Sequence, residues 1–180
     1  MLLEPFNESF FRQFGFEYVF NSRELEFPAK ALMKTSSSNI RVVDGSMLYN
    51  AQLRALTFEY FNKRMHHSRH NEYSVPEVFS IRKHVSTNKQ RAIATNGDGK
   101  PVGTVIFRQE GRTLVIEPIL FNSLEALEAL SDYLQRFSTQ ADIVRIPAAV
   151  ENFPLKHIIK RTEIPGTAIT VKQSRPIMDE

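Results

Sequence analysis

The stretch from Arg91 to Glu117 constrains the fold more than any other part of the chain, because three β-type runs alternate there with two short turns. The runs are residues 91–95, 102–108 and 113–117, and each contains β-branched residues that favour strands. The first turn, Asn-Gly-Asp-Gly-Lys at 96–100, has two glycines that permit the positive φ of tight hairpins. The second turn lies at 109–112. This pattern predicts a three-stranded antiparallel meander.

An amphipathic helix is predicted directly after the meander, from about Ser123 to Phe137. Its apolar stripe consists of Leu124, Leu127, Leu130, Leu134 and Phe137. Asn122, with Glu125 three residues later, is typical of a capping box. Apolar runs at 142–146 and 167–171 predict two further strands. Together these elements predict an α+β fold with a mixed, largely antiparallel sheet flanked by helices.

The N-terminal part predicts a helix, a strand and a linker. Phe10, Phe11 and Phe14 recur at helical spacing, and Gly15 can end that helix. Residues 17–27 predict a strand with mixed faces. Residues 29–39, which include three consecutive serines, are the best linker candidate in the chain.

A second strand and two helices are predicted between this linker and the meander. The strand covers 40–43, and the first helix starts at Asp44 or Ser46 and ends near Tyr60. Its expected apolar face consists of Leu48, Ala51, Ala55 and Phe58, joined by Leu56 and Tyr60. Pro76 suits the first turn of the second helix.

Composition excludes several classes of function. The chain has no cysteine, which rules out disulfides, cysteine-ligated zinc, thiol nucleophiles and iron–sulfur clusters. Apolar runs are only a few residues long, so no transmembrane helix is expected, and the N-terminus lacks the pattern of a secretory signal. The formal net charge of +3 tolerates an anionic ligand but does not by itself indicate a nucleic-acid partner. We expect a cytoplasmic protein with no membrane partner.

The segment FFRQFGFE at 10–17 resembles the closing signature of the GCN5-related N-acetyltransferase (GNAT) fold, which is an aromatic, a tyrosine, three residues and Gly-Phe. The chain more narrowly resembles the enhanced intracellular survival group, which carries two GNAT domains in tandem. LLEPFNESFFRQFGFEYVF is similar to the end of the first, catalytic domain. IRVVDGSMLYNAQLRALTFEYF, GDGKPVGTVIFR and EPILFNSLEALEALSDYLQRF are similar to the second domain. The resemblance therefore implies that residues 1–36 close a first domain and include a linker, and that residues 37–180 form a second, non-catalytic domain.

The resemblance implies acetyl transfer from acetyl-CoA to a small-molecule primary amine. That reaction uses a glycine-bearing loop between a strand and a helix, whose amides cradle the pyrophosphate. None of the seven glycines forms such a loop, and the expected connection at 117–123 contains Pro118, which lacks an amide donor. We therefore expect no tight binding of acetyl-CoA and no turnover by this chain, which looks like a partial or truncated member.

The family's catalytic tyrosine corresponds to Phe11, which has no hydroxyl and cannot act as an acid. Two interpretations stay open: Phe11 is a core aromatic together with Phe10 and Phe14, or it forms a wall of the acetyl pocket. Phe11 and Gly15 are consequently the weak candidates for cofactor binding. The resemblance also favours a homo-oligomer.

Several other clusters carry weaker signals. His66 and His70 would share a helix face, but two histidines without a nearby carboxylate are a poor metal site, so we expect no metal. The basic residues of 63–70, with those at 82–91, could form a phosphate or RNA surface or favour an acidic partner. Glu117 and Glu125 suit a surface charge and a helix cap better than a catalytic pair. The alternative function is therefore a non-catalytic GNAT-like binding or assembly module that contacts a charged partner.

Overall fold

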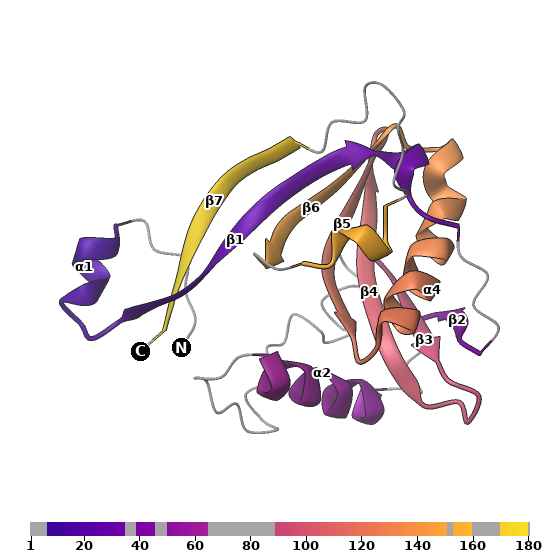
Figure 1. Cartoon of the computed structure of the whole chain (residues 1–180), viewed down its shortest axis with the longest axis horizontal. Helices are drawn as coiled ribbons and strands as arrows, with labels where there is room; N and C mark the ends of the chain where they lie inside the picture. The colour runs from indigo at the N-terminus through magenta and orange to yellow at the C-terminus, as the bar shows by residue number, and fades with distance from the viewer. Residues whose placement is uncertain are drawn as a thin grey trace.

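The described part of the chain forms one seven-stranded sheet with helices on both faces (Figure 1). The computed structural model describes residues 7–34, 39–45, 50–64, 89–150, 153–159 and 170–179. The strand order is β2-β3-β4-β5-β6-β1-β7. In chain order the strands are β1 (Glu17–Pro28), β2 (Arg41–Asp44), β3 (Gln90–Thr95), β4 (Pro101–Glu110), β5 (Thr113–Phe121), β6 (Ile143–Val150) and β7 (Thr170–Asp179). Every neighbouring pair is antiparallel except β5–β6, which is parallel, so the predicted fold class is confirmed.

The predicted meander is β3–β4–β5, and its first turn is closed by an asparagine. The Asn96 Oδ1 atom accepts hydrogen bonds from the backbone N–H groups of Asp98 and Lys100, at 3.2 and 2.9 Å. Gly99 has φ +75°, whereas Gly97 does not enter the positive-φ region. One of the two turn glycines therefore supplies the left-handed geometry of the turn.

β5 is longer than predicted, because it continues through Pro118 to Phe121. The register of β4 and β5 shifts between Val105 and Phe107, which pair with Ile119 and Ile116. Pro118 thus lies in a bulge of β5, where residues 117 and 118 oppose one residue of β4 and the ladder needs no amide donor.

Helix α4 (Leu124–Gln135) packs on one face of the sheet through Leu127, Leu130 and Leu134, which are at most 1% exposed. These leucines join the main core cluster with Phe107 and other strand residues. Two predicted details are wrong. Leu124 is 44% exposed, and the N-cap is Ser123 rather than Asn122.

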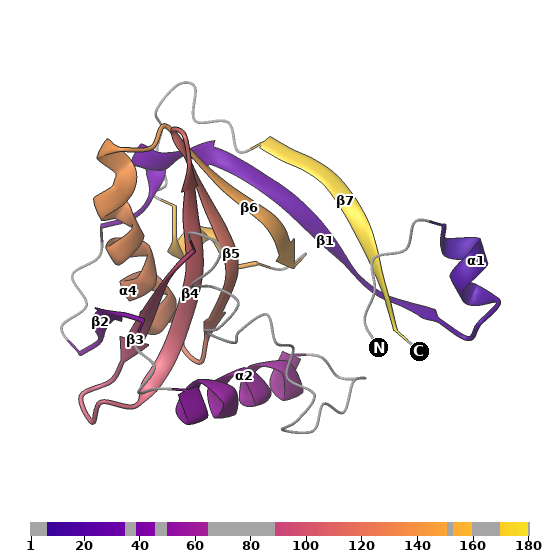
Figure 2. The same cartoon turned by 180° about the vertical axis from the view of Figure 1, so that it is seen from behind.

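Helix α2 (Asn50–Arg64) packs on the other face, below the ends of β3 and β4 in Figures 1 and 2. Alternate residues of β3 identify the two faces: Ala92 and Ala94 belong to the α4 core, and Ile93 packs against Leu53 and Leu56 of α2. Of the predicted apolar face, Ala51 and Ala55 are exposed. The expected face is therefore wrong at these positions, and the predicted second helix, after Pro76, lies outside the described residues.

The segment after β1 is part of the core rather than an exposed linker. A 3-10 helix at Ala29–Ala31 follows β1, and Ala29, Ala31 and Leu32 are at most 1% exposed. The Ala29 N–H group donates to the Asp142 carbonyl at 2.8 Å, and Leu32 bridges to Ile159. The linker prediction is thus wrong for the first part of 29–39. The domain boundary at 36/37 stays a prediction.

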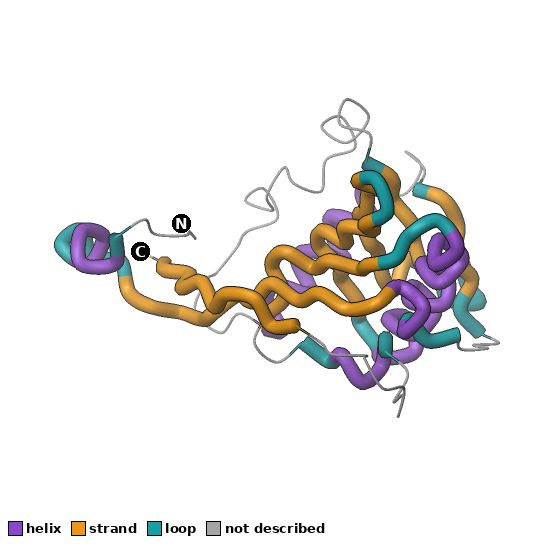
Figure 3. The backbone as a smooth tube through the Cα atoms, turned by 90° about the horizontal axis from the view of Figure 1, so that it is seen from above, coloured by secondary structure: helices purple, strands orange, loops and turns teal. Residues whose placement is uncertain are grey.

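β1 and β7 form a ribbon that extends away from the rest of the sheet, with α1 (Glu8–Arg12) at its far end (Figure 3). Residues 22–28 of β1 pair with β6 on one side, whereas residues 17–26 pair with β7 on the other. Of the helices in the described part of the chain, none has both the length and the apolar character that a membrane crossing requires.

Candidate functional site

The parallel strands β5 and β6 form a fork at the centre of the sheet. They pair over three residues each, from Thr113↔Ile143 to Val115↔Arg145. β5 then continues to Phe121 and β6 to Val150 without further pairing between the two, and Figure 1 shows the strands diverging. Ligands of open sheets often bind where neighbouring parallel strands part at their carboxyl ends. The fork and the β5–α4 junction beside it are therefore the first place to test for a cofactor site.

The β5–α4 junction contains only Asn122 and Ser123. The Ser123 hydroxyl accepts a hydrogen bond from the Ala126 N–H group at 3.2 Å, and the Ser123 carbonyl accepts one from Leu127 at 3.2 Å. The Asn122 N–H group donates to the Val102 carbonyl at 2.9 Å. Three amides at this end of α4 are thus bound within the protein, and no glycine widens the connection.

Two carboxylates also lie at this junction. The Asn122 side chain donates to the Glu59 Oε2 atom of α2 at 3.2 Å, and Glu125 lies exposed in the first turn of α4. Negative side chains are stabilised at a helix N-terminus, and they oppose a phosphate there. A short, glycine-free junction with two carboxylates does not fit a pyrophosphate cradle.

Glu117 lies two residues past Val115, the last residue of β5 that pairs with β6, and is held by two cations. Its Oε2 atom contacts the Lys89 ammonium, its Oε1 atom contacts the Arg108 guanidinium, and its side chain is 14% exposed. Burial, followed by the nearby charge of Arg108, lowers the pKa of Lys89. Because each Glu117 oxygen has a cationic partner, the arrangement suits a structural ion cluster. The sequence singled out Glu117 but not its pairing with Arg108 of β4 and with Lys89, the residue before β3.

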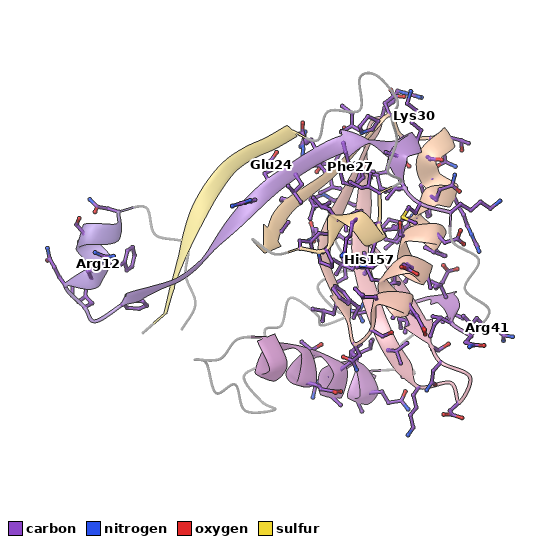
Figure 4. The ribbon with its side chains drawn as sticks, viewed as in Figure 1. Arg12, Glu24, Phe27, Lys30, Arg41 and His157 are labelled. Atoms are coloured by element: carbon purple, nitrogen blue, oxygen red, sulfur yellow. The ribbon has the colours of Figure 1, made fainter. Side chains whose placement is uncertain are left out.

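The segment 153–159 after β6 is attached to α4 by polar contacts. The His157 Nδ1 atom lies 3.0 Å from the Glu128 Oε1 atom, and the Ser131 hydroxyl donates to the Ile158 carbonyl at 3.1 Å. Figure 4 shows His157 between α4 and the strands. Ile158 and Ile159 are buried in the main core cluster. This segment therefore continues the core beside the fork.

The residues predicted from the closing signature lie on the projecting ribbon, away from α4 (Figure 1). Phe11 is half-buried, with ring centroids 5.4 Å from Phe10 and 5.7 Å from Phe16. Gly15 has φ +85° and is exposed. Phe10 and Phe14 are 44% and 60% exposed, so the interpretation of these two as core aromatics is wrong. The structure does not bring Phe11 or Gly15 to the fork, and their roles toward a cofactor stay predictions.

The remaining predicted clusters are mostly beyond the described residues. His66 and His70 lie there, as do residues 65–70 and 82–88 of the basic stretches. In the ranges that the structure does describe, no three histidine, aspartate or glutamate side chains are grouped closely enough for a metal. Lys89, which was expected on a basic surface, is paired with Glu117.

Several solved structures have the same arrangement of strands and helices. A GCN5-related N-acetyltransferase from Anabaena variabilis superimposes with a TM-score of 0.68 and 16% identity, over 98% of this chain and 44% of that one. The chain has the GNAT fold. The fold that the sequence resemblance implied is confirmed.

Two further solved structures are similar to this chain. A conserved protein of Enterococcus faecalis, named as a probable N-acyltransferase, matches with a TM-score of 0.71 and 19% identity, over 98% of this chain and 44% of that one. Eis1 from Mycobacterium abscessus matches with a TM-score of 0.60 and 14% identity, over 98% and 45%. The chain spans less than half the length of these three structures. No protein-family model and no curated protein matches the sequence.

Proposed function

We propose that this chain is the cradle-free GNAT domain of a longer N-acetyltransferase that transfers an acetyl group from acetyl-CoA to a primary amine. The observation that carries the proposal is the β5–α4 junction, which is two residues long, glycine-free and acidic within a GNAT fold. Acetyl-CoA would bind outside this junction, so the chain by itself would bind it weakly and acetylate nothing. A fold does not fix a function, which makes the assays below decisive.

The first assay uses the purified 180-residue chain. Its melting temperature is measured with increasing acetyl-CoA, because a ligand that binds only the native state must raise it. We expect no shift and no acetylation of spermidine, lysine or an aminoglycoside, whereas a GNAT enzyme with an intact glycine loop gives both. Amine acetylation by this chain would disprove the proposal.

The second assay distinguishes the proposal from a module without any enzymatic role. The coding sequence upstream of Met1 is inspected for a strand followed by Arg/Gln-x-x-Gly-x-Gly, and a polypeptide that includes this segment is assayed. We expect the longer polypeptide to acetylate a primary amine. If no such segment exists, or if the longer polypeptide is inactive, the function is the alternative one: a binding or assembly module.

A charged partner is proposed for that module from the basic residues that the sequence carries at 63–70 and 82–91. Assembly as a homo-oligomer is proposed from the family resemblance, and a cytoplasmic location from the cysteine-free composition. Sedimentation velocity at several protein concentrations tests the first, and cell fractionation tests the second.

A further inference from the structure

A hollow of about 660 Å³ lies between the edge strand β2, the β3–β4 turn and the last turns of α4. Small-molecule sites of proteins commonly have volumes of about 300–1,000 Å³. The hollow is at the opposite end of α4 from the β5–α4 junction, since it is lined by Asp132, Tyr133 and Arg136 rather than by residues 122–126. A ligand in this hollow would therefore not occupy the β5–α4 junction.

Two arginines from separate elements line this hollow. Arg41 lies on β2 at the edge of the sheet, where Figure 4 labels it, and Arg136 follows the last residue of α4. Both side chains are exposed, and neither guanidinium forms an ion pair in the part of the chain that the structure describes. Asp132 is the acidic residue of the lining. The lining therefore carries a net charge of +1, from two arginines and one aspartate.

The arginines are supported by ordered neighbours. The Arg136 guanidinium carbon lies 5.3 Å from the Tyr133 ring centroid, within the range of a cation–π interaction. The Tyr133 hydroxyl donates a hydrogen bond to the Asp44 Oδ1 atom on β2. The Thr95 hydroxyl donates to the Arg41 carbonyl at 3.1 Å, which fixes the backbone of β2 against β3. The walls are thus connected by interactions that leave the N–H groups of both guanidiniums available.

We propose that this hollow binds a small molecule with a carboxylate or phosphate group, anchored by Arg41 and Arg136. A guanidinium presents several N–H donors in a plane that matches the oxygens of both groups. Asp44 is not part of the lining, and its Oδ1 atom accepts the hydrogen bond from Tyr133. Asp132 is the residue of the lining that repels an anion. Removing its charge should therefore raise the affinity, whereas removing an arginine should lower it.

The experiment is a calorimetric titration of the chain with inorganic phosphate and with citrate, each at constant ionic strength against sodium chloride. The two probes separate phosphate from carboxylate recognition. We expect saturable binding of at least one of them. Arg41→Gln and Arg136→Gln should each weaken this binding about tenfold, which is the scale of a lost charge-assisted hydrogen bond. Asp132→Asn should tighten it by removing the repulsive charge.

Arg12→Gln is the matched control, because Arg12 is an exposed arginine on α1, far from the hollow in Figure 4. It should leave the affinity unchanged. The proposal is overturned if neither probe binds beyond the chloride reference, or if Arg12→Gln weakens binding as much as Arg41→Gln does. It is also overturned if Asp132→Asn weakens binding. Circular dichroism verifies that each variant is folded, and the opposite signs expected for arginine and aspartate variants cannot both result from partial unfolding.

Discussion

Tyr133 connects three parts of the structure through one side chain. Its ring packs at 6.2 Å from the Phe107 ring and 5.9 Å from Phe137, and its hydroxyl reaches Asp44 on the edge strand. Burial, followed by the hydrogen bond to Asp44, raises the pKa of Tyr133 to about 12. The folded state thus favours the protonated phenol.

This shift predicts how stability changes in alkali. Because the folded pKa is raised above the unfolded value of about 10, the contribution of Tyr133 is complete below pH 10 and is lost as the pH rises toward 12. The difference in unfolding free energy between wild type and Tyr133→Phe, measured in urea, should therefore be smaller at about pH 11.5 than at about pH 9. These two pH values lie on either side of the ordinary tyrosine pKa of about 10. A constant difference would contradict the shift.

The cap of α4 gives a second test at single residues. Ser123→Ala removes the hydroxyl that accepts from Ala126 and should cost about 1 kcal/mol of unfolding free energy. Asn122→Ala is the matched control, since its exposed side chain does not cap the helix, and it should cost less than about 0.5 kcal/mol. Urea unfolding distinguishes the two residues, and the reverse order would restore Asn122 as the cap.

Among the elements, α2 shows most directly how the sheet selects a helix face. Its apolar residues occur on several sides, so the pattern favoured a face that included Ala51 and Ala55. In the structure Leu53 and Leu56 are 5% and 3% exposed against Ile93, and those two alanines face solvent. Contact with β3 therefore determines which face of α2 is buried, which the periodicity of the sequence left ambiguous.

Leu56→Ala should lower the unfolding free energy by about 2–5 kcal/mol, because it removes buried methyl groups and leaves a cavity under α2. Arg54→Ala, at an exposed position of the same helix, should change it by less than about 0.5 kcal/mol. Denaturant unfolding of both variants provides the comparison. Equal small losses would mean that α2 contributes little to the stability of the sheet.

In the whole molecule, the ribbon of β1 and β7 differs from the rest of the sheet. The segment 17–21 pairs with β7 and has no partner on β6. Leu25, in contrast, is buried and pairs with both β6 and β7, and Phe27 is buried and pairs with β6. A two-stranded ribbon has marginal stability in water. We expect the amides of residues 17–21 to exchange with solvent faster than those of 25–27, measured by hydrogen exchange with NMR detection. Equal protection would show that the outer ribbon is covered in solution.

Much of the fold follows from local signals in the sequence. The meander, its turns, α4 and the approximate start of β6 were predicted correctly, because glycine geometry, strand alternation and helix periodicity act over a few residues. The details that failed depend on contacts between distant residues. Pro118 is tolerated within β5 because β5 itself bulges there, with residues 117 and 118 opposite one residue of β4. Ala29, Ala31 and Leu32 are buried because the start of β6 and the segment 153–159 pack against them.

The candidate sites divide in the same way. The sequence by itself determined that no glycine loop exists between β5 and α4, since that requires only a count of residues. The tertiary structure decided that Glu59 approaches this junction, that Lys89 and Arg108 hold Glu117, and that Arg41 and Arg136 share one hollow. These groups are separated along the chain, and the pairing of the strands together with the packing of α2 and α4 on opposite faces of the sheet brings them together.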